Sequence, residues 1–173
     1  MSHQPVIDGL DFARNASRLQ GTWPVAGFER LRDALRSSEG TLSYELRGVP
    51  EEFGRPALRL KVDGPLQLVC QRCLGALEHP LHIEAVLLLV ATQAEMDAEP
   101  LEAEGPESIV AGREMPVLSL VEDEVLLAIP IAPRHPACAD GMKEDAAGGV
   151  VDAAGARQMP FAGLRGLVGG TKH

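Results

Sequence analysis

The stretch ALRLKVDGPLQLVC, residues 57–70, carries the pattern that decides the fold. Its first half places Leu58, Leu60 and Val62 on one face and Arg59, Lys61 and Asp63 on the other. Alternation with a period of two indicates a strand with one buried face. Asp63 and Gly64 form a turn signal, and the apolar residues alternate again in LQLVC, residues 66–70. The stretch therefore predicts a β-hairpin that turns at Asp63 and Gly64.

Similar alternation occurs on both sides of this stretch. Residues 41–47 alternate Leu42, Tyr44 and Leu46 with polar side chains, and residues 81–88 alternate until both faces become apolar. A further short strand is expected at residues 108–111, inside an acidic loop at 92–114. Together these runs predict an antiparallel sheet of about four strands.

Two segments have helical periodicity. Residues 23–35 place apolar side chains at helical spacing behind Pro24, and residues 115–128 do so behind Pro116. The second helix would carry Glu122, Asp123 and Glu124 on its solvent face. The expected fold class is α+β, with an antiparallel β-sheet core, an N-terminal helix and a C-terminal helix.

The last part of the chain differs in composition. Residues 139–173 are rich in Gly and Ala and lack sustained periodicity, so they bury too little surface to offset their ordering entropy. We expect a domain at residues 1–138 and a flexible tail at 139–173. Within that tail the motif PFAGL, residues 160–164, is a candidate docking segment through Phe161 and Leu164.

Charge limits the classes of partner. The chain of 173 residues has a net charge of −9, which argues against wrapping a nucleic-acid backbone, so no DNA partner is expected and any RNA contact would be local. Residues 91–125 hold ten acidic residues and one basic residue, Arg113. This segment is either a solvated loop or a docking surface for a basic partner such as a ribosomal protein.

Targeting and membrane signals are not evident. The N-terminus has no basic region followed by an apolar run, and the longest apolar run, residues 85–91, is far below the ~20 residues that span a bilayer. The sequence also contains no P-loop, G-x-G-x-x-G, H-E-x-x-H or G-x-S-x-G motif. We therefore expect a cytoplasmic protein without membrane partners and without an enzyme signature.

The most specific chemical feature is a C-x-x-C pair, Cys70 and Cys73. With His135 and Cys138 it would make a Cys₃His site for zinc, although more than sixty residues separate the halves. A redox dithiol is the second explanation, with Arg72 placed to lower a thiol pKa. Two reduced cysteines that pack a turn are the third. The spacing alone leaves all three open.

Three motifs together resemble the YceD family of large ribosomal RNA subunit accumulation proteins. They are the stretch at residues 54–81 with CQRCL, then LVEDEVLLAIPIAPRH at 120–135, and PFAGL at 160–164. The resemblance implies a non-enzymatic ribosome-biogenesis factor that supports 23S rRNA accumulation and large-subunit assembly. Its implied partner is a pre-50S particle, through either ribosomal protein or 23S rRNA.

Candidate residues follow from both lines of reasoning. For partner binding they are Arg72, Glu122, Asp123, Glu124, Phe161 and Leu164; for a metal they are Cys70, Cys73, His135 and Cys138. Family members often carry more cysteines near the C-terminus, whereas this chain has only Cys138 there. The cofactor is therefore zinc in a Cys₃His site or none, and the alternative function is a zinc- or thiol-dependent redox protein acting through Cys70 and Cys73.

Overall fold

The computed structural model describes residues 4–98 and 105–138. All helices and strands below belong to the unit Met1–Pro136. The expected tail, with its docking residues Phe161 and Leu164, lies outside the described residues.

Strands dominate the described chain, and the helices are few. The elements are β1 (Val6–Ile7), α1 (Gly9–Arg14), β2 (Arg18–Pro24), the 3₁₀ turns η1 (Val25–Gly27) and η2 (Arg32–Ala34), β3 (Leu35–Ser37), β4 (Thr41–Glu52), β5 (Arg55–Val69), β6 (Ala76–Val90), α2 (Gln93–Asp97), β7 (Glu107–Val110), β8 (Met115–Pro116) and α3 (Val117–Ala128). This content confirms the α+β class.

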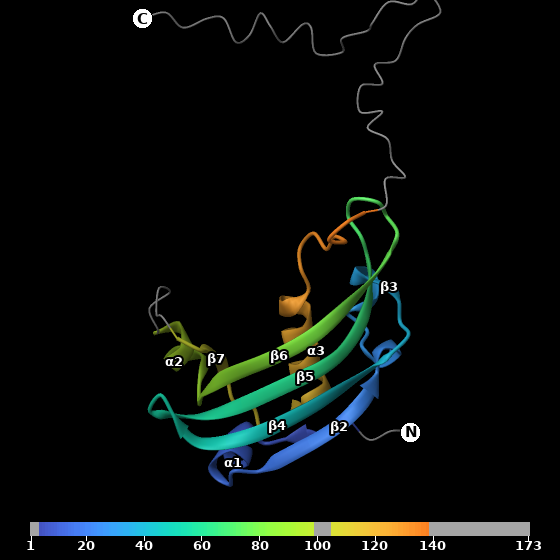
Figure 1. The fold of residues 1–173 in the computed structure, drawn as a ribbon. Helices are drawn as coiled ribbons and strands as arrows, with labels where there is room; N and C mark the ends of the chain where they lie inside the picture. The colour runs from blue at the N-terminus through green and yellow to red at the C-terminus, as the bar shows by residue number, and fades with distance from the viewer. Residues whose placement is uncertain (1–3, 99–104, 139–173) are drawn as a thin grey trace, which may run out of the picture. The chain divides into compact units, whose positions relative to one another are not determined.

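The main sheet has the strand order β2-β4-β5-β6-β7, and β3 pairs separately with β5. Its long central strands are antiparallel, as predicted, while β7 runs parallel to β6. Strands β1 and β8 form a small second sheet. Figure 1 shows the main sheet as a curved layer, with α3 crossing one of its faces.

The predicted hairpin at Asp63 and Gly64 is wrong. Strand β5 continues from Arg55 to Val69, and Gly64 pairs with Leu81 of β6. The reason is the alternation: Leu58, Leu60 and Val62 before Gly64 and Leu66 and Leu68 after it all have even numbers. One unbroken strand therefore buries these five side chains on the same face. The actual turns lie at the ends of β5, where it meets β4 and β6.

The predicted helix at residues 23–35 is also wrong. This segment contains the end of β2, the two 3₁₀ turns and the start of β3. Phe28 and Leu31 are nevertheless fully buried. The periodicity therefore identified these core residues correctly but predicted the wrong backbone conformation for them. The N-terminal helix is α1, and the predicted C-terminal helix is confirmed as α3, which begins after Pro116.

The core lies between α3 and the inner face of the sheet. Strands β4, β5 and β6 contribute Leu42, Leu46, Leu58, Leu60, Val62, Leu66, Leu68, Leu81, Ile83 and Leu87, and α3 contributes Val117, Val121 and Val125. The opposite face of these strands is polar over most of its length. None of the described helices is both long and apolar enough to cross a membrane.

Gly48 offers a test of the packing between α1 and β4. A Cβ atom added at Gly48 would lie 2.1 Å from the backbone oxygen of Phe12, which cannot rotate away. We expect Gly48→Ala to lower the free energy of unfolding by about 2 to 3 kcal/mol, measured by denaturant unfolding. Gly27→Ala is the control, because nothing lies within 4 Å of its Cβ position. Equal effects of the two substitutions would contradict this account.

Candidate metal centre

The turn between β5 and β6 presents the C-x-x-C pair. The Cys70 N–H donates to the Gly75 carbonyl at 3.0 Å, and the Leu74 N–H donates to the Cys70 carbonyl at 2.9 Å. Leu74 has a φ of 57°, in the left-handed region that a bulky side chain rarely adopts. These two hydrogen bonds close a tight turn around Cys73.

The loop after α3 reaches this turn. Helix α3 ends at Ala128, and the prolines at 130 and 133 keep the following chain from continuing as helix. The Gln71 N–H donates to the Pro133 carbonyl at 2.8 Å. His135 is thereby brought beside residues that lie about sixty positions earlier in the sequence.

Four candidate ligands meet at this place. The ligand atoms of Cys70, Cys73, His135 and Cys138 all lie within 4.8 Å of one another. Cys70 is buried, the other three are partly buried, and no disulfide joins any of the cysteines. The sequence selected these same four residues, and together they form a group that could hold a metal ion.

His135 is oriented by two contacts on opposite sides of its ring. Its Nε2 lies 2.8 Å from the Ala76 carbonyl oxygen, and its Nδ1 lies 3.4 Å from Cys73 Sγ. A carbonyl can only accept, so Nε2 carries the proton and a neutral ring keeps its lone pair on Nδ1. The ring therefore presents Nδ1 to the cysteines as a ligand atom, with the second nitrogen held by the backbone.

Cys70 is set up to be a thiolate. Hydrogen bonds from backbone N–H groups, first that of Cys73 and then those of His135 and Arg72, lower the pKa of Cys70 from 9.0 to about 5 against the opposing effect of burial. The thiolate is the form that binds metal and also the form that acts as a nucleophile. Its pKa by itself does not separate these uses.

The donor set fits zinc. Three sulfurs and one imidazole nitrogen are the soft and borderline ligands of structural zinc sites. Bond lengths of roughly 2.3 Å for Zn–S and 2.0–2.1 Å for Zn–N require ligand atoms roughly 3.5 to 3.8 Å apart. The distance between Cys73 Sγ and His135 Nδ1, 3.4 Å, already matches such an edge.

The acidic residues of α3 are not a uniform solvent face, so the expected position of Glu122 is wrong. Glu122 is buried, and its carboxylate accepts from the Arg30 backbone N–H at 2.7 Å and from Arg30 Nε at 2.9 Å. Asp123 accepts from Arg30 Nη1 at 2.6 Å. Both carboxylates raise the pKa of Arg30. Glu122 and Asp123 thus connect α3 to the segment around Arg30, which also contributes Phe28 and Leu31 to the core. Sequence spacing alone could not reveal this contact.

Two further candidates for partner binding, Glu124 and Arg72, lie at the surface. Glu124 borders a hollow of about 360 Å³ between α3 and β7, where burial, Glu107 and Asp123 raise its pKa. Arg72 is exposed on the turn that carries the cysteines. Both are accessible to a partner, whereas Glu122 is occupied within the fold.

Comparison with known proteins identifies a family to which the chain is similar. The family model described as large ribosomal RNA subunit accumulation protein YceD matches residues 58–168, which is well over half of the chain. That range includes most of β5, all of β6, α3 and the four candidate ligands. No solved structure matches the chain at the significance required of a relative.

The contact between Arg30 and α3 generates a prediction. We expect Glu122→Ala to lower the free energy of unfolding by about 2 to 3 kcal/mol, because it leaves the Arg30 N–H and guanidinium without their shared acceptor. Asp123→Ala removes an equal charge from an exposed ion pair and should cost less than about 1 kcal/mol. Urea unfolding of both variants measures the difference; a larger effect at Asp123 would refute the assignment.

Proposed function

The chain belongs to the YceD family, and from that premise we propose that it is a non-enzymatic factor that supports 23S rRNA accumulation by binding a pre-50S particle in the cytoplasm. The family match carries this proposal, because the name of the family describes accumulation of the large ribosomal RNA subunit. The partner on the particle is either ribosomal protein or 23S rRNA. Among the described residues, the predicted contact residues Arg72, Asp123 and Glu124 lie exposed or at a hollow, and Asp123 is also paired with Arg30.

Zinc has a structural role in this proposal. The four candidate ligands lie within 4.8 Å of one another. Four protein ligands would fill all positions of a tetrahedral zinc and leave none for water or substrate, which is typical of structural rather than catalytic zinc. Bound there, the ion would tie the turn between β5 and β6 to the chain that follows α3. Arg72 would then be held in one orientation, ready for a partner.

A thiol redox function is the second candidate, favoured by the low pKa of Cys70. Its geometry is less suited to that chemistry. Cys70 is fully buried, so an external disulfide or thiol cannot reach its sulfur without local opening. The pair also leads into a strand and not into a helix whose N-terminus could stabilise a thiolate.

Elemental analysis tests the zinc proposal. We expect about one zinc per purified chain, and a large loss of zinc in Cys73→Ser, which removes one sulfur ligand. His79→Ala is the matched control, because His79 lies in β6 outside the ligand group. Removal of zinc by a chelator should lower the melting temperature of the wild type.

Two results would contradict the structural zinc. One is an equal zinc content in Cys73→Ser and the wild type. The other is a metal-free chain whose Cys70 and Cys73 cycle readily between dithiol and disulfide in a thiol titration, which would support the redox function.

Co-sedimentation tests the ribosomal proposal. We expect the full chain to migrate with precursors of the large subunit on a sucrose gradient, and its depletion to lower the ratio of 23S to 16S rRNA. The ratio of the two rRNAs controls for general effects on growth. An unchanged ratio after depletion would sink the proposed function.

A further inference from the structure

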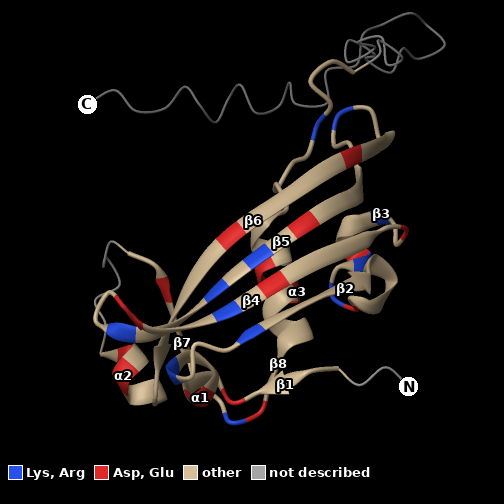
Figure 2. Cartoon of the chain, turned by 60° about the horizontal axis from the view of Figure 1, so that its bottom comes forward, with Lys and Arg blue, Asp and Glu red and all other residues tan. Residues whose placement is uncertain are grey.

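Three arginines form a row across the outer face of the main sheet. The register pairs Arg18 of β2 with Arg47 of β4, and Arg47 with Arg59 of β5. Their side chains are 51, 54 and 57% exposed. Figure 2 shows basic segments of β2, β4 and β5 lying side by side. We call Arg18, Arg47 and Arg59 the arginine row.

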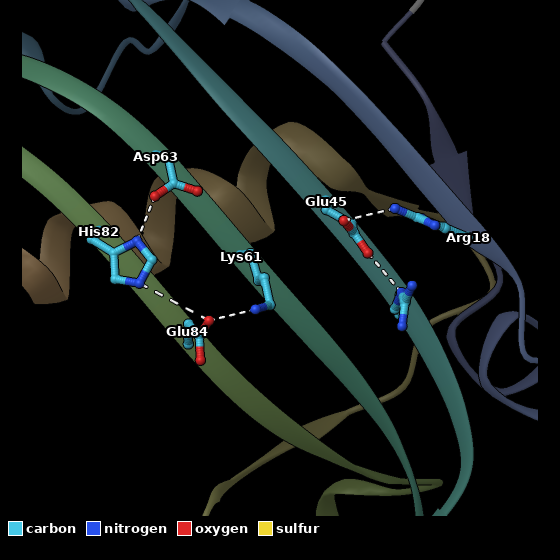
Figure 3. A network of polar contacts seen from close by, with 7 residues as sticks. Arg18, Glu45, Lys61, Asp63, His82 and Glu84 are labelled. Atoms are coloured by element: carbon cyan, nitrogen blue, oxygen red, sulfur yellow. Dashed lines mark hydrogen bonds and ion pairs between the residues drawn. The ribbon is translucent and has the colours of Figure 1, made fainter.

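The next row on the same face has a different charge pattern. There Glu45 of β4 pairs in register with Lys61 of β5, and Lys61 with Glu84 of β6, so the signs alternate. Figure 3 shows this network, in which Lys61 pairs with Glu84. Opposite charges across strands stabilise a sheet and like charges directly opposite destabilise it. The direct opposition of three arginines in register is therefore not an arrangement that by itself stabilises the sheet.

The carboxylates near the row do not neutralise it. Glu45 is shared between Arg18 at 2.9 Å and Arg47 at 2.6 Å, while Glu52 binds Arg59. Three guanidinium groups thus face two carboxylates, which leaves one positive charge in excess. A guanidinium has five N–H donors, and these ion pairs use only one donor of Arg18 and one of Arg47. Donors remain for an external anion.

The surface beside the row is hollowed. A depression of about 390 Å³ is lined by Arg18, Arg47 and Arg59 together with Ala16, Gly48 and Val49. Adjacent strands lie about 4.8 Å apart, so the row spans about 10 Å. Arginine side chains are long and an unpaired strand is flexible, so the row can contact two or three consecutive backbone phosphates.

We propose that the arginine row binds consecutive backbone phosphates of RNA. This inference rests on the proposed function and names RNA as the direct partner. It also goes beyond the family match, which begins at residue 58 and so leaves out Arg18 and Arg47. Guanidinium groups bind phosphate through paired N–H donors, and a contact of three residues agrees with a chain whose overall charge permits only local RNA binding.

The tip of the hairpin between β4 and β5 favours RNA over an acidic protein. Phe53 is 71% exposed there, and its φ of 52° is unusual for an aromatic residue. It follows Glu52, which is bonded to Arg59 of the row. Phe53 lies at the tip of the hairpin whose strands carry Arg47 and Arg59, and an exposed ring there is a platform on which an unpaired base can stack.

Binding of the full chain to a protein-free 23S rRNA transcript tests the inference across a range of salt concentrations. Replacing Arg18, Arg47 and Arg59 with Gln should reduce the slope of log affinity against log salt by about 2 to 3. A control replaces the exposed arginines Arg32, Arg113 and Arg134 with Gln, which changes the net charge equally. This control should retain most of the affinity and the wild-type slope. Phe53→Ala should weaken binding about tenfold without changing the slope, because stacking is not ionic.

The outcomes separate the two proposals. The inference is overturned if the wild-type chain does not bind the transcript. It is also overturned if the row variant keeps the wild-type slope of log affinity against log salt, or if the control variant loses as much affinity as the row variant. If the row variant no longer sediments with pre-50S particles and the wild type does not bind free RNA, the arginine row binds an acidic protein and the inference fails. If the row binds RNA but the wild type does not sediment with pre-50S particles, the inference stands and the proposed function falls. Unchanged binding by Phe53→Ala removes the stacking role.

Discussion

The unbroken alternation of β5 is the constraint on which the rest of the structure depends. This strand of 15 residues pairs with β4 along one edge and with β6 along the other, and its N–H and C=O groups are satisfied only while that pairing is kept. Because the side-chain period is two, one register fixes both faces at once. The inner face becomes the core under α3, and the outer face collects the charges, including the arginine row. Strand β5 ends at Val69, so Cys70 is the first residue of the turn between β5 and β6.

Two sets of polar contacts join α3 and the loop after it to other parts of the fold. Glu122 and Asp123 of α3 bind Arg30, so that the segment with Phe28 and Leu31 closes the core. The loop after α3 is bound to the cysteine turn through the Gln71 N–H and the ring of His135. Each set of contacts joins residues that lie far apart in the sequence, and the second assembles the candidate metal centre. A metal there would strengthen a contact that backbone hydrogen bonds already make.

The two faces of the main sheet differ in character, the inner one apolar and the outer one charged. The inner face packs the apolar core, and the group of residues that could hold a metal lies at one end of β5. The outer face offers guanidinium groups with unused donors. Such a division suits a factor that positions a local RNA contact on a protein of net negative charge.

The sequence by itself determined the α+β class, the helix near residues 115–128 and the four strands β4 to β7, and it offered the four candidate ligands as one of three explanations of the cysteines, because period, proline placement and ligand chemistry are local properties. It did not determine that β5 passes through Gly64 without turning, or that residues 23–35 form turns and strand ends, because alternative backbones bury the same apolar residues. Burial of Glu122 and the alignment of Arg18, Arg47 and Arg59 were likewise decided only by the tertiary structure. The physical reason is that ion pairing across elements and cross-strand register depend on which strands are neighbours, and no local pattern encodes that.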